Sequence, residues 1–180
     1  ERGVRVFITE MDESQQFDGL AAKVNNAPVI VVSKYWPGDR QRFTLAHELG
    51  HLLVEGRLSP DMDEEKAANR FAGAFLVPLE EAFNRLGQER KRLEPYELGC
   101  LKKEYGLSMA GWVYRAYDLG IINQSSFRNM MRFFSMRGWL RVEPVQLDAK
   151  ETPALFEQMV FRALGQDLIN ESKAAELLRK

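Results

Sequence analysis

The sequence has few of the side chains that bind metals or form cross-links. Only two of its 180 residues are histidine, and Cys100 is its single cysteine. A lone cysteine cannot form an internal disulfide, so we expect a protein of a reducing compartment, the cytoplasm. No apolar run approaches the ~18 residues of a membrane-spanning helix. These absences argue against a disulfide-stabilised secreted domain and against a membrane protein.

Charge is nearly balanced overall but unevenly distributed. The net charge of −1 combines −5 for the first half of the chain with +4 for the second half. Most of the positive excess lies between Arg90 and Arg141, where ten basic side chains accompany four acidic ones. This asymmetry indicates subregions with different partners. We therefore divide the chain into an acidic unit (1–89), a basic helical subdomain (90–145) and C-terminal helices (146–180).

The first forty residues show the patterns of β-strands. Val4, Val6 and Ile8 recur at every second position, as in a half-buried strand. Leu20–Val24 and Val29–Ser33 flank a turn-forming Asn-Asn-Ala-Pro segment and predict a hairpin. We expect these strands to form a small antiparallel sheet.

The remainder of the chain is predicted to be almost entirely helical. A first helix covers about 40–54, and Ser59-Pro60-Asp61 is expected to start a second helix that ends near Leu76. Further helices are expected after residue 79, over 95–106, 108–120 and 125–136, and after residue 152. The fold class is therefore α+β, a small sheet followed by an all-helical region.

Both histidines lie in one motif with chemical meaning. His47-Glu48-Leu49-Gly50-His51 has the HExxH pattern, whose histidines share one face of a helix and can reach a single metal ion. Imidazole nitrogen suits Zn²⁺, and a catalytic zinc ion usually has three protein ligands. Glu48 is suited to act as general base. A chance match is expected in fewer than ~1% of chains of this length.

The third ligand must be sought among carboxylates, because no histidine remains. The next predicted helix begins with four acidic residues: Asp61, Asp63, Glu64 and Glu65. We favour Glu65, because Asn69 follows one turn later on the same face and could orient His47 or His51. Glu64, the second choice, is rotated by ~100° and is expected to face elsewhere. Alternatively, all four acids only stabilise the start of the helix.

These motifs resemble the ImmA/IrrE family of zinc metallopeptidases. The resemblance rests on Arg-Phe-Thr-Leu-Ala before His47, on Glu-Lys-Ala-Ala-Asn-Arg-Phe-Ala from Glu65, and on Leu76-Val77-Pro78. It extends over roughly residues 3–145 through later helical segments. It implies a zincin-like metallopeptidase core over 1–89, with one Zn²⁺ ion bound by His47, His51 and Glu65 and with Glu48 as the catalytic base.

The resemblance also implies a biological role. Members are cytoplasmic endopeptidases whose protein substrates are helix-turn-helix repressors or antitoxins, so we expect transcription regulation. Many relatives carry an N-terminal DNA-binding domain, and a chain that opens on Glu1 rather than Met is compatible with the absence of such a domain here.

Two features of the proposed enzyme stay open at this stage. Five side chains could stabilise the oxyanion by their chemistry alone: Tyr35, Arg40, Arg42, Tyr114 and Arg115. We expect the substrate to pair with Val29–Ser33, taken as an edge strand.

The basic half supports a rival interpretation. Residues 98–117 resemble a helix-turn-helix, and nearby arginines and lysines could contact nucleic-acid phosphates. The second helix of that segment offers mainly packing residues, which makes DNA contact the less favoured reading. The alternative function is a DNA-binding transcriptional regulator whose metallopeptidase core is regulatory or vestigial.

Overall fold

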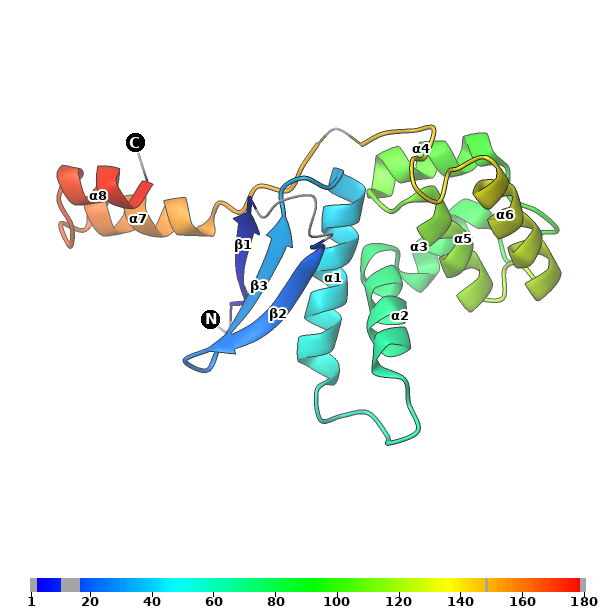
Figure 1. The fold of residues 1–180 in the computed structure, drawn as a ribbon, viewed down its shortest axis with the longest axis horizontal. Helices are drawn as coiled ribbons and strands as arrows, with labels where there is room; N and C mark the ends of the chain where they lie inside the picture. Colours follow the sequence, from blue (N-terminus) through cyan, green and yellow to red (C-terminus); the bar gives the residue numbers. More distant parts are fainter. Residues whose placement is uncertain (1–2, 11–16, 148, 179–180) are drawn as a thin grey trace.

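A computed structural model describes residues 3–10, 17–147 and 149–178. In this part of the chain a three-stranded sheet precedes eight helices (Figure 1), so the α+β class is confirmed. The strands are β1 (Arg5–Thr9), β2 (Gly19–Val24) and β3 (Ala27–Ser33). The helices are α1 (Gly38–Val54), α2 (Glu64–Leu76), α3 (Leu79–Leu86), α4 (Pro95–Tyr105), α5 (Met109–Asp118), α6 (Gln124–Met136), α7 (Leu155–Gly165) and α8 (Glu171–Leu178). Glu1, on which the chain opens, lies outside the described residues.

The sheet is mixed, with strand order β1-β3-β2. β2 and β3 form the expected antiparallel hairpin. Asn25 and Asn26 join them with φ angles of 49° and 63°, which suit the right-handed twist of a tight hairpin and which asparagine tolerates well. β1 runs parallel to β3, so the expectation of an antiparallel sheet is wrong for this pair.

β3 is the central strand. Ile30 and Val32 are only 2% and 0% exposed, and β3 has a partner strand on each side. The prediction that Val29–Ser33 forms an edge is therefore wrong. The edges of the sheet are β1 and β2, one on each side of β3.

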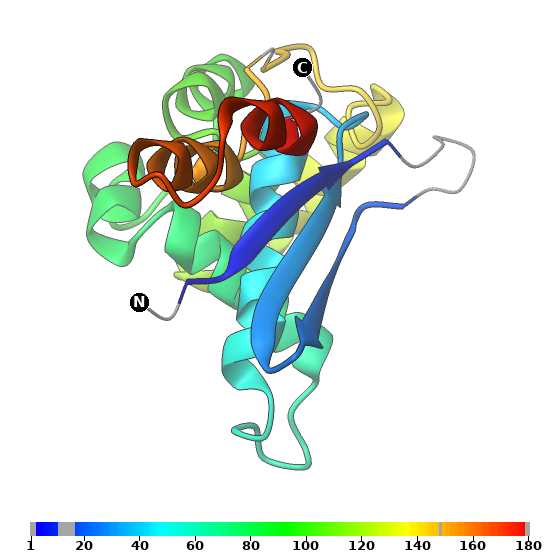
Figure 2. The ribbon, with the colours of Figure 1, turned by 90° about the vertical axis from the view of Figure 1, so that its left-hand side faces the viewer.

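α1 packs against the sheet, and α2 lies beside α1 in the opposite direction (Figures 1 and 2). Small residues allow close approach: a Cβ atom on Gly50 would lie 3.1 Å from the Cα atom of Ala68. α2 begins at Glu64 rather than at Ser59-Pro60-Asp61, because the side chain of Asp63 accepts a hydrogen bond from the Lys66 backbone N–H and caps the helix there.

The largest group of buried side chains lies in the helical half. Trp112, Val113 and Ala116 of α5 are fully buried at its centre, and α3 contributes Ala82 and Leu86 to the same core. α3 therefore packs with the helical half, although the sequence groups it with residues 1–89. That three-part division stays a prediction.

The burial of α5 bears on the helix-turn-helix reading. Along α5 the large side chain left exposed is Tyr114. A recognition helix must present several side chains to base edges, whereas most side chains of α5 are buried in the core. Within the described residues, no helix combines the length and apolar composition needed to cross a bilayer.

Candidate metal centre

Three side chains from two adjacent helices converge on one point. His47 and His51 project from α1 and Glu65 from α2, and one ligand atom of each lies within 4.8 Å of the others. The two Nε2 atoms are 3.0 Å apart. The carboxylate oxygens of Glu65 lie 3.5 Å from Nε2 of His47 and 3.3 Å from Nε2 of His51.

These separations can be compared with the demands of a metal ion. Ligand atoms at ~2.0–2.2 Å from a tetrahedral zinc ion are roughly 3.3–3.5 Å apart. The observed separations of 3.0, 3.3 and 3.5 Å lie close to that value. The donor set of two imidazoles and a carboxylate also suits zinc chemically. The residues present therefore fit the group that the sequence predicts.

The other nitrogen of each imidazole has its own partner on α2. Oδ1 of Asn69 lies 3.1 Å from Nδ1 of His47, and Oε1 of Glu64 lies 2.9 Å from Nδ1 of His51. A carboxylate oxygen only accepts hydrogen bonds, so Nδ1 of His51 donates to it and the lone pair of Nε2 is left for a metal ion. Such partners orient histidine ligands and raise their basicity.

The contact of Glu64 corrects the expectation that it faces away. The ~100° rotation between Glu64 and Glu65 on an ideal helix predicts different directions for their side chains, but it does not include the antiparallel packing of α1 and α2. Because the helices run in opposite directions, the start of α2 lies beside His51 and the next turn of α2 lies beside His47. Glu64 is also the first helical residue, and its side chain leans toward the helix N-terminus. Sequence spacing alone carries no such information.

Asp63 fixes the start of α2, on which this arrangement depends. The backbone N–H of Lys66 donates to its carboxylate, which lowers the pKa of Asp63. The cap therefore holds the first turn of α2, with Glu64 and Glu65, in helical geometry.

Glu48 is half-buried on α1 between the two histidines. No hydrogen bond or ion pair engages its carboxylate in the described part of the chain. Glu48 follows His47 directly in the sequence, and a carboxylate without a protein partner at such a position is available as a general base for the cluster of His47, His51 and Glu65.

A comparison with family models identifies the chain. The model of a peptidase family, described as the IrrE N-terminal-like domain, matches residues 1–117. The chain belongs to this family. The match covers the sheet, α1, α2 and the whole cluster, and it confirms the resemblance to the ImmA/IrrE metallopeptidases. No curated protein matches the chain.

One member of the cluster of this peptidase-family chain, His51, borders a hollow of about 350 Å³. Its walls come from α1, from the start of α2 and from edge strand β2: Ala21, Ala22, Lys23, His51, Leu52, Glu55 and Glu64. His47 and His51 are 17% and 21% exposed, whereas Glu65 is 69% exposed. A ligand approaching along β2 would therefore reach the cluster from solvent.

The five oxyanion candidates are engaged elsewhere or lie apart from the cluster. Arg40 pairs with Asp18 and stacks on Trp36, and Arg42 pairs with Glu151. Tyr114 packs edge-on against Phe127, and the ring of Tyr35 lies beneath Lys34. Arg115 is buried and donates to the backbone carbonyl of Val77 at 3.0 Å, and this burial lowers the pKa of its guanidinium. In the described residues, no hydrogen bond or ion pair joins any of the five to the cluster.

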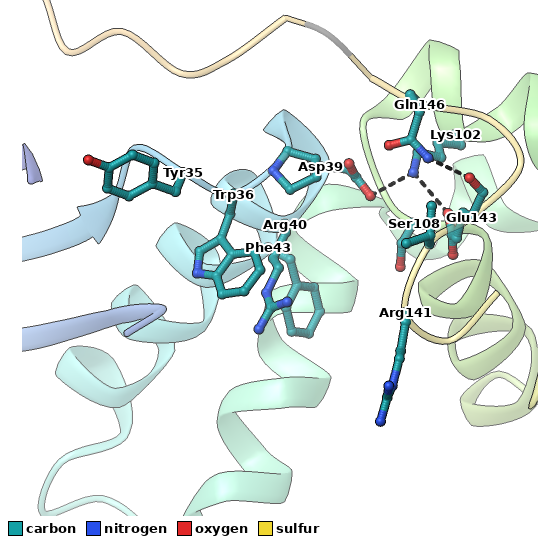
Figure 3. A pocket seen from close by; sticks show the side chains of 12 residues that line it. Tyr35, Trp36, Asp39, Arg40, Phe43, Lys102, Ser108, Arg141, Glu143 and Gln146 are labelled. Atoms are coloured by element: carbon teal, nitrogen blue, oxygen red, sulfur yellow. Dashed lines mark hydrogen bonds and ion pairs between the residues drawn. The ribbon is translucent and has the colours of Figure 1, made fainter. Parts of the chain in front are cut away.

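A second pocket of about 370 Å³ lies at the N-terminal end of α1 (Figure 3). It is separate from the cluster, although Phe43 lines it and stacks on His47 with ring centroids 6.3 Å apart. Lys102 lies at its inner wall, between Asp39 and Glu143 (Figure 3). These ion pairs connect the start of α1 to the helical half.

Proposed function

We propose that the chain is a zinc-dependent metallo-endopeptidase that cleaves a protein. The observation that carries the proposal is the convergence of His47, His51 and Glu65 on one point. Membership of a metallopeptidase family supports it independently of this geometry.

Each residue has a distinct role in the proposed mechanism. His47, His51 and Glu65 would hold one zinc ion, while Asn69 and Glu64 orient the two imidazoles. When bound, the ion supplies a Lewis acid that polarises the scissile carbonyl and makes water more acidic. Glu48 takes a proton from the attacking water and delivers it to the leaving amine.

β2 is suited to hold the substrate. It is an edge strand, it contacts α1, and Ala21 to Lys23 line the hollow beside His51. An extended peptide could add to its open edge through main-chain hydrogen bonds. β3 cannot take this role, because it is paired on both sides. A complex with a substrate analogue that showed no main-chain pairing to β2 would refute it.

We infer that the substrate is a cytoplasmic helix-turn-helix repressor or antitoxin. The motif resemblance to ImmA/IrrE peptidases supports this inference. A second candidate, a DNA-binding regulator with a vestigial peptidase core, is favoured by the exposed arginines of α6, among them Arg128 and Arg132. The burial of α5 speaks against it, because base reading by that helix is blocked.

Replacing the proposed base tests the enzyme directly. Glu48→Gln should bind as much zinc as the wild type but should cleave a repressor encoded beside its gene at least ~100-fold more slowly. Glu80→Gln, on the exposed face of α3, makes the same chemical change and should leave cleavage unaltered. Cleavage by Glu48→Gln at the wild-type rate would contradict the role of Glu48. Binding of less than about half an equivalent of zinc at saturation would contradict the metal centre.

A further inference from the structure

The C-terminal helices stand apart from the rest of the molecule. α7 and α8 form a hairpin that projects beyond the sheet, on the side opposite to α2 (Figure 1). Val160 and Ala174, only 4% and 5% exposed, are the buried residues of α7 and α8. In the described chain, α8 is the only element with which α7 makes extensive contact. The hairpin also lies beyond the family match, which ends at residue 117.

α7 carries more apolar surface than its contact with α8 covers. Leu155, Phe156 and Met159 follow one another along one side of the helix and are each about half exposed. Phe161 is 53% exposed on another side of α7, and Leu168 in the turn is 72% exposed. We call Leu155, Phe156, Met159 and Leu168 the hairpin face.

A pair of helices this short cannot bury enough apolar surface to be stable by itself. The hairpin face therefore needs a cover. Its charges argue against an anionic membrane or a nucleic acid, because residues 155–178 contain four acidic and only two basic side chains. A protein surface is the cover that this chemistry fits.

We propose that the hairpin face is covered by the same face of a second copy of the chain. Two helical hairpins joined about a two-fold axis form a four-helix bundle, in which each helix packs against two neighbours. α7 has the two apolar sides that such a position requires, one toward α8 and one formed by Leu155, Phe156 and Met159.

The available area agrees with self-association. The four large apolar side chains of the hairpin face, each half exposed or more, offer on the order of 400 Å² per copy. Pairing two copies would bury roughly 800 Å² of apolar surface. Because apolar atoms make up roughly two-thirds of a homodimer interface, the total of about 1,200 Å² reaches the lower end of specific interfaces. The sheet lies between the hairpin and α1 (Figures 1 and 2), so the dimer leaves the metal centre accessible.

The test is the mass of the full chain in solution, measured by sedimentation equilibrium between ~1 and ~100 µM. The wild type should approach twice its chain mass of 20.7 kDa as concentration rises. Phe156→Glu with Met159→Glu should hold the mass at 20.7 kDa throughout. Gln158→Glu with Gln166→Glu adds the same charge at exposed polar positions of the same hairpin and should dimerise like the wild type.

Several outcomes would overturn the proposal. A wild-type chain that stays monomeric at ~100 µM would show that the hairpin face is covered in another way. A dimer that survives both glutamate substitutions would place the interface elsewhere. Helix content by circular dichroism shows whether the variant hairpin has folded; if it has not, Leu155→Glu alone provides the same test. Zinc content measures the metal centre separately, so a failure of the dimer proposal does not affect the proposed function.

Discussion

Oε1 of Glu64 lies 2.9 Å from Nδ1 of His51, on the opposite side of the ring from Nε2, the atom that faces the cluster. The neighbouring Glu65 approaches Nε2 of the same ring, at 3.3 Å. Two consecutive carboxylates on α2 thus contact the two nitrogens of one imidazole. In the proposed site Glu65 is a metal ligand, whereas Glu64 orients the ligand His51. Matched substitutions can test these two roles.

Glu65→Gln and Glu64→Gln should weaken zinc binding to different extents. Loss of the anionic ligand in Glu65→Gln should lower the zinc affinity by more than ~100-fold, whereas loss of the hydrogen-bond acceptor charge in Glu64→Gln should lower it by ~10–100-fold. Competition with a chromophoric chelator measures both constants. A larger loss for Glu64→Gln than for Glu65→Gln would reverse the two assignments.

Gly50→Ala should push α1 and α2 apart. Its Cβ atom would lie 3.1 Å from the Ala68 Cα atom and from Cδ1 of Phe71, so backbone must shift. We expect a loss of ~1–3 kcal/mol in the free energy of unfolding, together with weaker zinc binding, because Glu65 moves with α2. Gly73→Ala is the matched control, since its Cβ atom would make an ordinary 3.7 Å contact and should stabilise the helix. Equal effects of the two changes would contradict the prediction.

Asp63→Ala should destabilise the protein in a pH-dependent way. The hydrogen bond from Lys66 holds the pKa of Asp63 below its usual value of 3.8. A lowered folded-state pKa stabilises the fold above the unfolded-state pKa, and this contribution disappears as the pH falls through the folded-state value. Thermal unfolding should therefore show a wild-type advantage near neutral pH that shrinks below pH 3.8. An advantage that persists unchanged in acid would argue against the charged cap.

Lys102→Met should be strongly destabilising. Nζ of Lys102 lies 2.9 Å from Oδ2 of Asp39 and 2.9 Å from Oε2 of Glu143, and the three side chains are nearly inaccessible (Figure 3). Removal of the ammonium group leaves two buried carboxylates without their shared counter-ion, which should lower the free energy of unfolding by ~3–5 kcal/mol. Lys103→Met, at the adjacent exposed position, should change the free energy of unfolding little. Denaturant titration compares the two, and similar midpoints would contradict the role of Lys102.

Some elements could be predicted because their signals are local. The Asn25-Asn26 turn, the proline that opens α4 and the serine that caps α5 each act within a few residues of their own position. The start of α2 was misplaced because Ser59-Pro60-Asp61 and Asp63 both resemble caps, and the hydrogen bond to Lys66 decides between them.

By itself the sequence determined that His47 and His51 share one face of a helix, and it predicted a carboxylate as the third ligand of a metal ion held there. Helical spacing sets the first, and the absence of any other histidine sets the second. Only the tertiary structure decided that β2 rather than β3 is an open edge, and that Glu64 meets His51 while Asn69 meets His47. Strand order and the register of α1 against α2 depend on packing between segments distant in the chain, and periodicity within a segment does not encode them.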